Sequence, residues 1–173
     1  MRLVDCEEAC HAGAMLGILN EAIVNSTAIY DYLPRPAASM PEWFAAKRAA
    51  AYPVLGMESP DGTLLGFASY GRFRPHAAYK YSVEHSVYVH HEHRGRGIGA
   101  RLLAALIERA RAQDLHLLVG GLDAANAASI ALHRKLGFAH AGTITQAGFK
   151  FGRWLDLAFY QLHLDSPHHP VDG

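Results

Sequence analysis

A basic, glycine-rich stretch near the middle of the chain has the residue types of a phosphate-binding loop. Residues 90–99 read HHEHRGRGIG, with three histidines, two arginines and three glycines in ten positions. The apolar pattern after it predicts a helix over about 97–113, and the pattern before it predicts a strand over 81–89. Because a helix N-terminus has unpaired N–H groups and a partial positive charge, a glycine loop here is suited to hold a pyrophosphate.

The loop differs from two better-known phosphate motifs. It lacks the terminal Gly-Lys-Ser/Thr of a Walker loop, and its order Gly95-Arg96-Gly97-Ile98-Gly99 is not GxGxxG. Arg94 and Arg96 are placed to add charge-assisted bonds to phosphate oxygens. The alternative is a tight turn with a solvated basic rim, and the loop taken alone leaves both interpretations open.

Glu84 is a candidate general base because glutamate is unfavourable in the middle of a strand. Alternation places it on one face with Ser82, Ser86 and Tyr88, and places His85 on the opposite face with the valines of the same strand. A carboxylate held there could take a proton from an ammonium group, directly or through a water. The alternative is an edge-strand glutamate that faces solvent.

The histidines give a weaker signal. His85, His90, His91 and His93 match no common zinc spacing, so we expect no metal. His133 lies in a predicted helix, where it is either a proton donor or a packed, partly buried residue. Arg74, with its neighbours Pro75 and His76, is a candidate for binding a substrate carboxylate, and Tyr30 lies in an aromatic loop that could line the same pocket.

The surrounding pattern predicts one mixed α/β domain over 1–165 and a flexible tail over 166–173. Ser39 is expected to cap its helix in a capping box with Glu42, and Asp61-Gly62 is expected to form a hairpin turn. The expected strands cover 2–5, 52–59, 63–73, 81–89, 115–122 and 154–164, and the expected helices cover 12–26, 39–51, 97–113 and 126–138.

Composition narrows the class of protein. Hydrophobic residues make up 50% of the chain, charged residues 18%, and the formal net charge is zero, which disfavours nucleic acid and membrane partners. The two cysteines, Cys6 and Cys10, are interpreted as reduced packing residues. The N-terminus lacks the apolar core of a signal peptide, so we expect a cytoplasmic protein.

Three motifs together resemble one acetyltransferase family. Arg94-x-x-Gly97-x-Gly99 after HSVYV resembles the acetyl-CoA loop of the GNAT superfamily, and NAASIALHRKLGF (126–138) resembles its second half. YSVEHSVYV with AGFKFGRWLDLAFYQ is similar to the phosphinothricin and methionine sulfoximine N-acetyltransferases. The resemblance covers almost the whole chain and implies the GNAT fold, a central twisted mixed sheet flanked by helices.

The resemblance also implies the cosubstrate acetyl-CoA and the residues that bind it. In this family the strand that precedes the loop splays from its parallel neighbour, here 115–122, so that its free backbone groups bind the pantetheine arm and the acetyl oxygen. Asn126 also suits a plain helix cap. The implied cofactor-binding residues are Val87, Tyr88, Val89, Arg94, Gly95, Arg96, Gly97, Ile98, Gly99, Ala100, Asn126 and Ser129.

The resemblance further implies direct acetyl transfer to the α-amino group of a small amino acid, with Glu84 as base and His133 as candidate acid. Methionine sulfoximine, methionine sulfone and phosphinothricin are the expected substrates, and a homodimer is the expected assembly. The implied substrate-binding residues are Arg74, Pro75, His76, Glu84, His85, Ser86 and Tyr30.

Three other functions remain open from the sequence. A protein N-terminal acetyltransferase would need an open peptide groove, and a non-catalytic acyl-CoA sensor would have no use for Glu84. A nucleic-acid-binding module is poorly supported by the neutral charge.

Overall fold

The computed structural model describes residues 1–172, and the chain forms two compact units. The first unit contains residues 1–69 and 86–106, and the second contains residues 70–85 and the chain from 107 onward. Their strands belong to a seven-stranded mixed sheet in the order β1-β2-β3-β4-β5-β7-β6, which confirms the expected α/β class. The single domain over 1–165 stays a prediction.

The first unit is an antiparallel set of strands with two helices of its own. Its core forms because α1 has apolar residues three and four positions apart, and Met15, Leu19 and Ile23 from this face are almost fully buried. Phe44 of α2 and Phe67 of β3 belong to the same core. The elements are β1 (Arg2–Asp5), α1 (Glu8–Asn25), α2 (Ser39–Ala49), β2 (Val54–Glu58) and most of β3 (Leu64–Arg72).

The first unit confirms the predicted hairpin turn but not the predicted capping box. Gly62 has φ +86°, and Ser59 N–H donates to Thr63 O, so the predicted hairpin is confirmed. The predicted capping box is wrong, because Ala38 already has helical φ and ψ and is the N-cap. Ser39 therefore lies inside the first turn, and its hydroxyl donates to Pro36 O instead.

The second unit holds the parallel strand pair that the resemblance implied. Over its first three residues, β4 (Ser82–Val89) pairs in parallel with β5 (Leu117–Asp123), from Ser82↔Leu117 to Glu84↔Val119. A crossover through α3 (Ile98–Ala112) joins these two strands. The helix α4 (Ala127–Lys135) follows β5.

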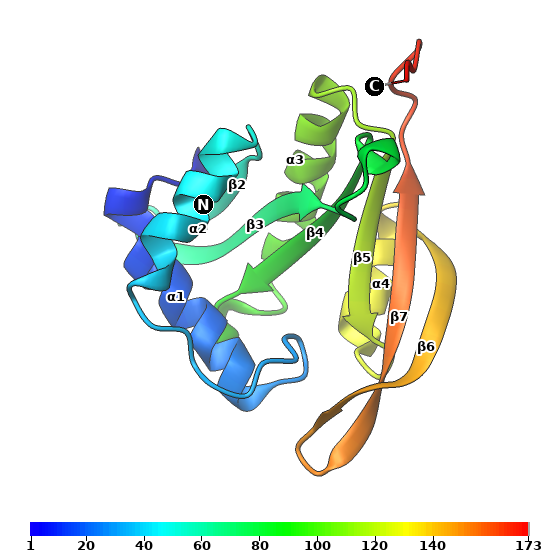
Figure 1. Cartoon of the computed structure of the whole chain (residues 1–173). Helices are drawn as coiled ribbons and strands as arrows, with labels where there is room; N and C mark the ends of the chain where they lie inside the picture. The colour runs from blue at the N-terminus through cyan, green and yellow to red at the C-terminus, as the bar shows by residue number, and fades with distance from the viewer. Residues whose placement is uncertain (173) are drawn as a thin grey trace. The chain divides into compact units, whose positions relative to one another are not determined.

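The twelve-residue strand β6 (Ala139–Lys150) was not predicted. It forms a long hairpin with β7 (Arg153–His163), drawn in orange in Figure 1. Its register with β7 shifts between His140 and Gly142 and again between Ile144 and Gly148. These irregularities remove the sustained alternation by which a strand is recognised in sequence.

The C-terminal segment makes hydrogen bonds to the rest of the second unit. Ser166 is buried, and its hydroxyl donates to Leu115 O at 2.6 Å. Val171 N–H donates to Tyr81 Oη at 3.1 Å. The flexible tail over 166–173 stays a prediction, and Gly173 lies outside the described residues. Among residues 1–172, no helix combines the length and apolar character that crossing a bilayer requires.

Candidate active site

The glycine-rich loop in the first unit has the backbone conformation expected of an anion-binding loop. It leaves β4 through a short 3₁₀ turn at His91–His93 and ends where α3 begins at the buried Ile98. Gly95 and Gly97 both have φ +76°, and no atom lies within 4 Å of a Cβ built on either. Glycine is therefore needed here for the left-handed backbone, not for lack of space.

Arg94 is already engaged within the first unit. Its Nη2 lies 2.9 Å from Glu21 Oε2 on α1, and its Nε donates to Val89 O at 3.3 Å. Half of the Arg94 side chain remains exposed, and Arg96 is exposed as well. Any anion bound by Arg94 must therefore compete with the Glu21 carboxylate.

The end of β4 is packed closely against β3 in the first unit. A Cβ at Gly66 would lie 2.7 Å from Tyr88 O and 3.1 Å from Val89 Cα, so only glycine fits there. The Tyr88 ring packs on Phe67 with 5.5 Å between centroids. Gly66 thus allows the end of β4 to lie close to β3. The predicted binding of the pantetheine arm by the backbone of Val87, Tyr88 and Val89 stays a prediction.

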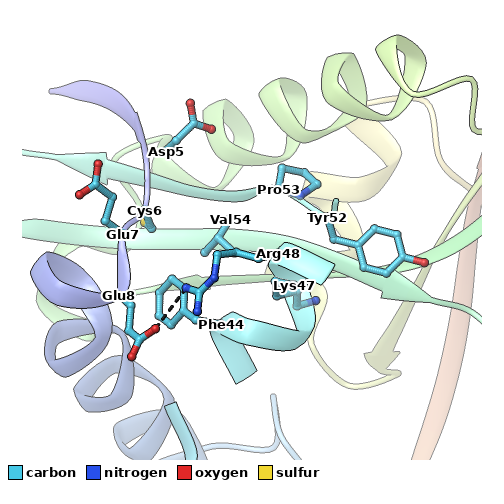
Figure 2. Close-up of a pocket in the computed structure, with 10 residues that line it drawn as sticks. All are labelled: Asp5, Cys6, Glu7, Glu8, Phe44, Lys47, Arg48, Tyr52, Pro53 and Val54. Carbon is cyan, nitrogen blue, oxygen red and sulfur yellow. Dashed lines mark hydrogen bonds and ion pairs between the residues drawn. The ribbon is translucent and has the colours of Figure 1, made fainter. Parts of the chain in front are cut away.

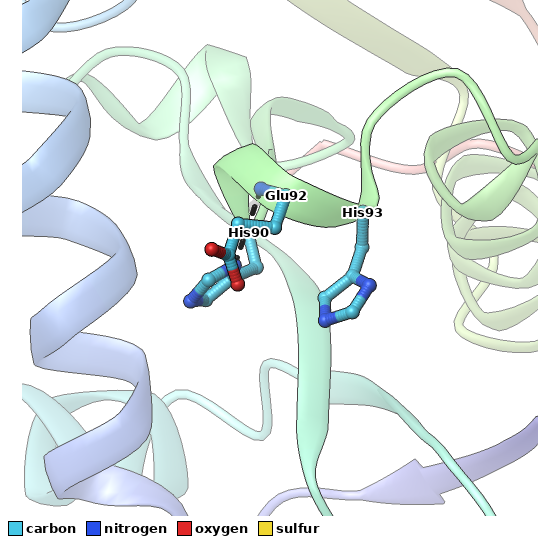
Figure 3. A group of neighbouring side chains, drawn as sticks. All are labelled: His90, Glu92 and His93. Atoms are coloured by element: carbon cyan, nitrogen blue, oxygen red, sulfur yellow. Dashed lines mark hydrogen bonds between the residues drawn. The ribbon is translucent and has the colours of Figure 1, made fainter.

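Three side chains gather in the turn just before the loop (Figure 3). One possible ligand atom from each of His90, Glu92 and His93 lies within 4.8 Å of the others. Glu92 N–H donates to His90 Nδ1 at 3.4 Å, so part of this proximity comes from the local turn. His93 Nδ1 is buried and has no hydrogen-bond partner. The expectation that no metal binds stays a prediction.

Glu84 and Arg74 form an ion pair in the second unit. Arg74 Nη1 lies 3.7 Å from Glu84 Oε2, and the two side chains are 45% and 38% exposed. Burial raises the pKa of the Glu84 carboxyl above its ordinary value, and the Arg74 charge partly offsets this. Glu84 is thus a partly buried carboxylate on a strand between two others, not an edge-strand residue facing solvent.

His85 points to the opposite face of β4 and contacts His133 of α4. Their Nε2 atoms are 2.9 Å apart, and both residues are buried. His85 does not share the Glu84 face, and both ring nitrogens of His133 have hydrogen-bond partners. The substrate contact of His85 and the acid role of His133 stay predictions.

Two adjacent glycines on β5 make room for these side chains. A Cβ at Gly120 would lie 2.9 Å from His85 Cε1 and 3.0 Å from His133 Nε2, and a Cβ at Gly121 would lie 3.1 Å from Glu84 Oε1. Sequence reasoning missed this role of Gly120 and Gly121. The available signal was a Gly-Gly pair inside an otherwise apolar strand, which marks a close approach.

The start of α4 confirms one predicted role of Asn126. Its Oδ1 accepts the N–H of Ser129 at 3.0 Å, so Asn126 caps the helix. Contacts of Asn126 and Ser129 with coenzyme A stay predictions.

The other predicted substrate-binding residues fall into two groups. Near Arg74, Pro75 O accepts a hydrogen bond from Arg72 Nη1 at 3.2 Å, and His76 is exposed. Arg74 itself stacks on the Phe73 ring, 4.1 Å from its centroid. Tyr30 and Ser86 belong to the first unit, and their contact with substrate stays a prediction.

A separate open pocket of about 320 Å³ lies in the first unit (Figure 2). Arg48 and Glu8 form an ion pair across it at 3.1 Å, and burial lowers the pKa of Lys47 to about 8. Lys47 Nζ lies over the Trp43 ring, 5.1 Å from its centroid. None of the predicted site residues lines this pocket, whose walls are Asp5, Cys6, Glu7, Glu8, Phe44, Lys47, Arg48, Tyr52, Pro53 and Val54.

Comparison with known proteins gives the class. The profile of the Acetyltransferase (GNAT) family matches residues 20–138. The L-methionine sulfoximine/L-methionine sulfone acetyltransferase of Pseudomonas paraeruginosa is 51% identical over 87% of this chain and 88% of its own. The chain therefore belongs to the GNAT family and is an acetyltransferase.

Solved structures agree with this assignment. An N-acetyltransferase from Staphylococcus aureus Mu50 has a TM-score of 0.91 and 45% identity, covering 94% of this chain and 97% of its own. A GNAT superfamily phosphinothricin acetyltransferase from Sinorhizobium meliloti, in complex with AcCoA, has a TM-score of 0.93 and 35% identity, covering 98% of this chain and 91% of its own. These neighbours confirm the predicted GNAT fold.

Proposed function

We propose that this chain transfers an acetyl group from acetyl-CoA to the α-amino group of small amino-acid analogues, and that this detoxifies them. Methionine sulfoximine, methionine sulfone and phosphinothricin are the candidate substrates. The names of the P. paraeruginosa and S. meliloti proteins support this substrate class, and the AcCoA complex of the latter supports the acyl donor.

The Arg74–Glu84 pair is the observation that carries this proposal. A free α-amino acid has a carboxylate and an ammonium on one carbon, and this pair offers the two complementary charges 3.7 Å apart on partly exposed side chains. The guanidinium suits bidentate binding of the carboxylate, and Glu84 suits the ammonium. The reacting residue of a longer peptide has no free α-carboxylate, so the arrangement favours free amino acids over protein N-termini.

The residues of the glycine loop fit the binding of acetyl-CoA. Left-handed Gly95 and Gly97 and the N-terminus of α3 suit the pyrophosphate, with Arg94 and Arg96 adding positive charge. We assign Gly99, Ala100, Asn126 and Ser129 to further contacts, and the backbone of Val87–Val89 to the pantetheine arm and acetyl oxygen. When bound, acetyl-CoA supplies an electrophilic thioester carbonyl.

Glu84 acts as the general base in the proposed reaction. It takes a proton from the substrate ammonium, directly or through a water, and its raised pKa makes it a stronger base than an ordinary carboxylate. The amine then attacks the carbonyl carbon, the C–N bond forms, the C–S bond breaks, and sulfur leaves with the electron pair as a thiolate. The nitrogen gives up its second proton, which ends on this thiolate, directly or through water. A thiol with a pKa of about 8.5 can leave without obligatory acid assistance.

Transfer without an enzyme-bound acetyl group fits the state of Cys6. Burial and the nearby carboxylates of Glu58 and Asp5 raise the pKa of Cys6 to about 12, so its nucleophilic thiolate is scarce.

We also propose that the chain forms a homodimer in the cytoplasm, without nucleic acid or membrane partners. Large apolar side chains are exposed on the β6–β7 hairpin, which suits a protein interface: Ile144, Phe149, Phe151 and Trp154. Light scattering tests the assembly, and a monomer at micromolar concentration would contradict it.

The test of function is a thiol-release assay with acetyl-CoA and a matched substrate panel. The panel pairs methionine sulfone with its methyl ester, and adds methionine sulfoximine, phosphinothricin, common amino acids and short peptides. We expect turnover of the free analogues and a large loss with the ester. Turnover of peptides alone would assign protein N-terminal acetylation, and acetyl-CoA binding without any turnover would favour a sensor.

A further inference from the structure

The hydrogen bonds around His133 determine where its proton lies. His133 Nδ1 is 2.7 Å from Ser129 O, and a carbonyl oxygen can only accept, so Nδ1 carries the hydrogen. In a neutral His133, Nε2 is then a bare acceptor. The 2.9 Å contact between the two Nε2 atoms therefore requires His85 Nε2 to be the donor.

This assignment leaves one open nitrogen in the pair. His85 Nδ1 is buried without a hydrogen-bond partner, so a proton added to the pair would have to enter there. His133 itself has no N–H left to give, because its only hydrogen is held by Ser129 O. Burial lowers the pKa of His133 and lowers that of His85 to about 3. Repulsion from a charged His133 would lower the pKa of His85 further, and the nearby Val119 backbone partly offsets this.

The side chains that pack on the pair are aromatic. The Phe138 ring lies 5.2 Å from the His85 centroid and 5.1 Å from the His133 centroid, and Tyr160 of β7 lies 6.3 Å from His133. The cationic Arg134 of α4 and His140 of β6 pack on the Tyr160 ring. Glu84, the nearest carboxylate along β4, points to the opposite face of the strand.

We propose that His85 and His133 form a neutral pair that positions β4 for catalysis and that neither donates a proton to the departing thiolate. This inference rests on the proposed function, because that function supplies the reaction in which the pair acts. The pair connects the α4 backbone to His85, the residue next to the proposed base. His85 and His133 are therefore positioning residues, and Gly120 preserves the space that their contact needs.

The tautomers can be measured without any substrate. Two-dimensional ¹⁵N–¹H spectra of the imidazole rings, assigned with His85→Gln and His133→Gln, report which nitrogens carry hydrogen. We expect protonated Nδ1 in His133, protonated Nε2 in His85, and no change across about pH 6 to 8. A doubly protonated His133 that titrates in this range would overturn the proposal whatever the substrate.

Kinetics separate positioning from acid catalysis by comparing two substitutions at one site. The amide oxygen of His133→Gln can still accept from His85, whereas His133→Leu cannot. We expect His133→Leu to lower kcat roughly ten- to hundredfold, and His133→Gln to recover most of that loss. In both variants the midpoint of the pH profile should stay at the wild-type value.

Acid catalysis by His133 predicts a different kinetic result. If His133 donated the proton, Gln and Leu would reduce kcat alike, and a descending limb in the wild-type profile near neutral pH would disappear in both. Should His133→Leu fail to fold, Gly120→Ala replaces it, because its Cβ would crowd both rings. We expect that variant to lower kcat without moving the pH midpoint, and a moved midpoint would contradict positioning.

Discussion

Gly121 on β5 lies directly against Glu84 on β4, and a Cβ at Gly121 would come within 3.1 Å of Glu84 Oε1. The proposed base therefore depends on a neighbouring residue that has no side chain. We predict that Gly121→Ala lowers kcat several-fold by displacing the carboxylate, which is the flexible end of its side chain. Gly17→Ala, where a Cβ meets no atom within 4 Å, is the control and should leave kcat unchanged.

Removing the charge of Glu84 should separate catalysis from cofactor binding. Glu84→Gln keeps the size of the side chain but cannot take a proton at neutral pH. We expect kcat to fall by about 10²- to 10⁴-fold, with acetyl-CoA affinity retained in calorimetry. Undiminished turnover would remove Glu84 as the base, and joint loss of binding and turnover would indicate a folding defect.

The acidic limb of the pH–rate profile should respond to Arg74. A base works when deprotonated, so activity rises as pH passes through the pKa of Glu84, which burial raises. The Arg74 charge lowers that pKa, so Arg74→Met should move the limb to higher pH. It should also raise KM for free amino acids. The exposed Arg72 supplies the matched control, and an equal shift in Arg72→Met would contradict the specific role of Arg74.

A second carboxylate should control acid stability independently of the site. Hydrogen bonds from Arg2 and His11 hold the pKa of Glu58 below its ordinary value. The ionised form is thus favoured in the folded state, so its contribution is present above the unfolded pKa and lost as pH falls through the folded pKa. Glu58→Gln should lower Tm at pH 7 and flatten the fall of Tm toward acid. Melting curves at several pH values measure both effects, and a wild-type slope in the variant would disprove the linkage.

Metal removal should leave the enzyme unaffected. The His90–Glu92–His93 group lies just before the glycine loop, but the proposed mechanism uses no ion. We therefore expect dialysis against a chelator to leave both kcat and Tm unchanged. Loss of activity that zinc restores would instead assign these residues a metal.

Local sequence patterns predicted most helices and strands. Some features that they missed depend on contacts between residues far apart in the sequence. Alternation along 81–89 correctly placed Glu84 and His85 on opposite faces, because that depends on strand periodicity alone. The contact between His85 and His133 joins residues 48 positions apart, and no local pattern encodes it. The strand β6 was missed for a different reason, since its two register shifts break the periodicity on which prediction depends.

The ion pair between Arg94 and Glu21 gives the glycine loop an internal counter-ion. We expect a free phosphate to gain little by replacing the carboxylate, because the guanidinium is already paired. We expect a ligand that also engages the loop amides and the helix terminus to gain enough to displace it. The pair would then act as a selectivity threshold, which favours large multivalent anions such as a nucleotide pyrophosphate over small anions.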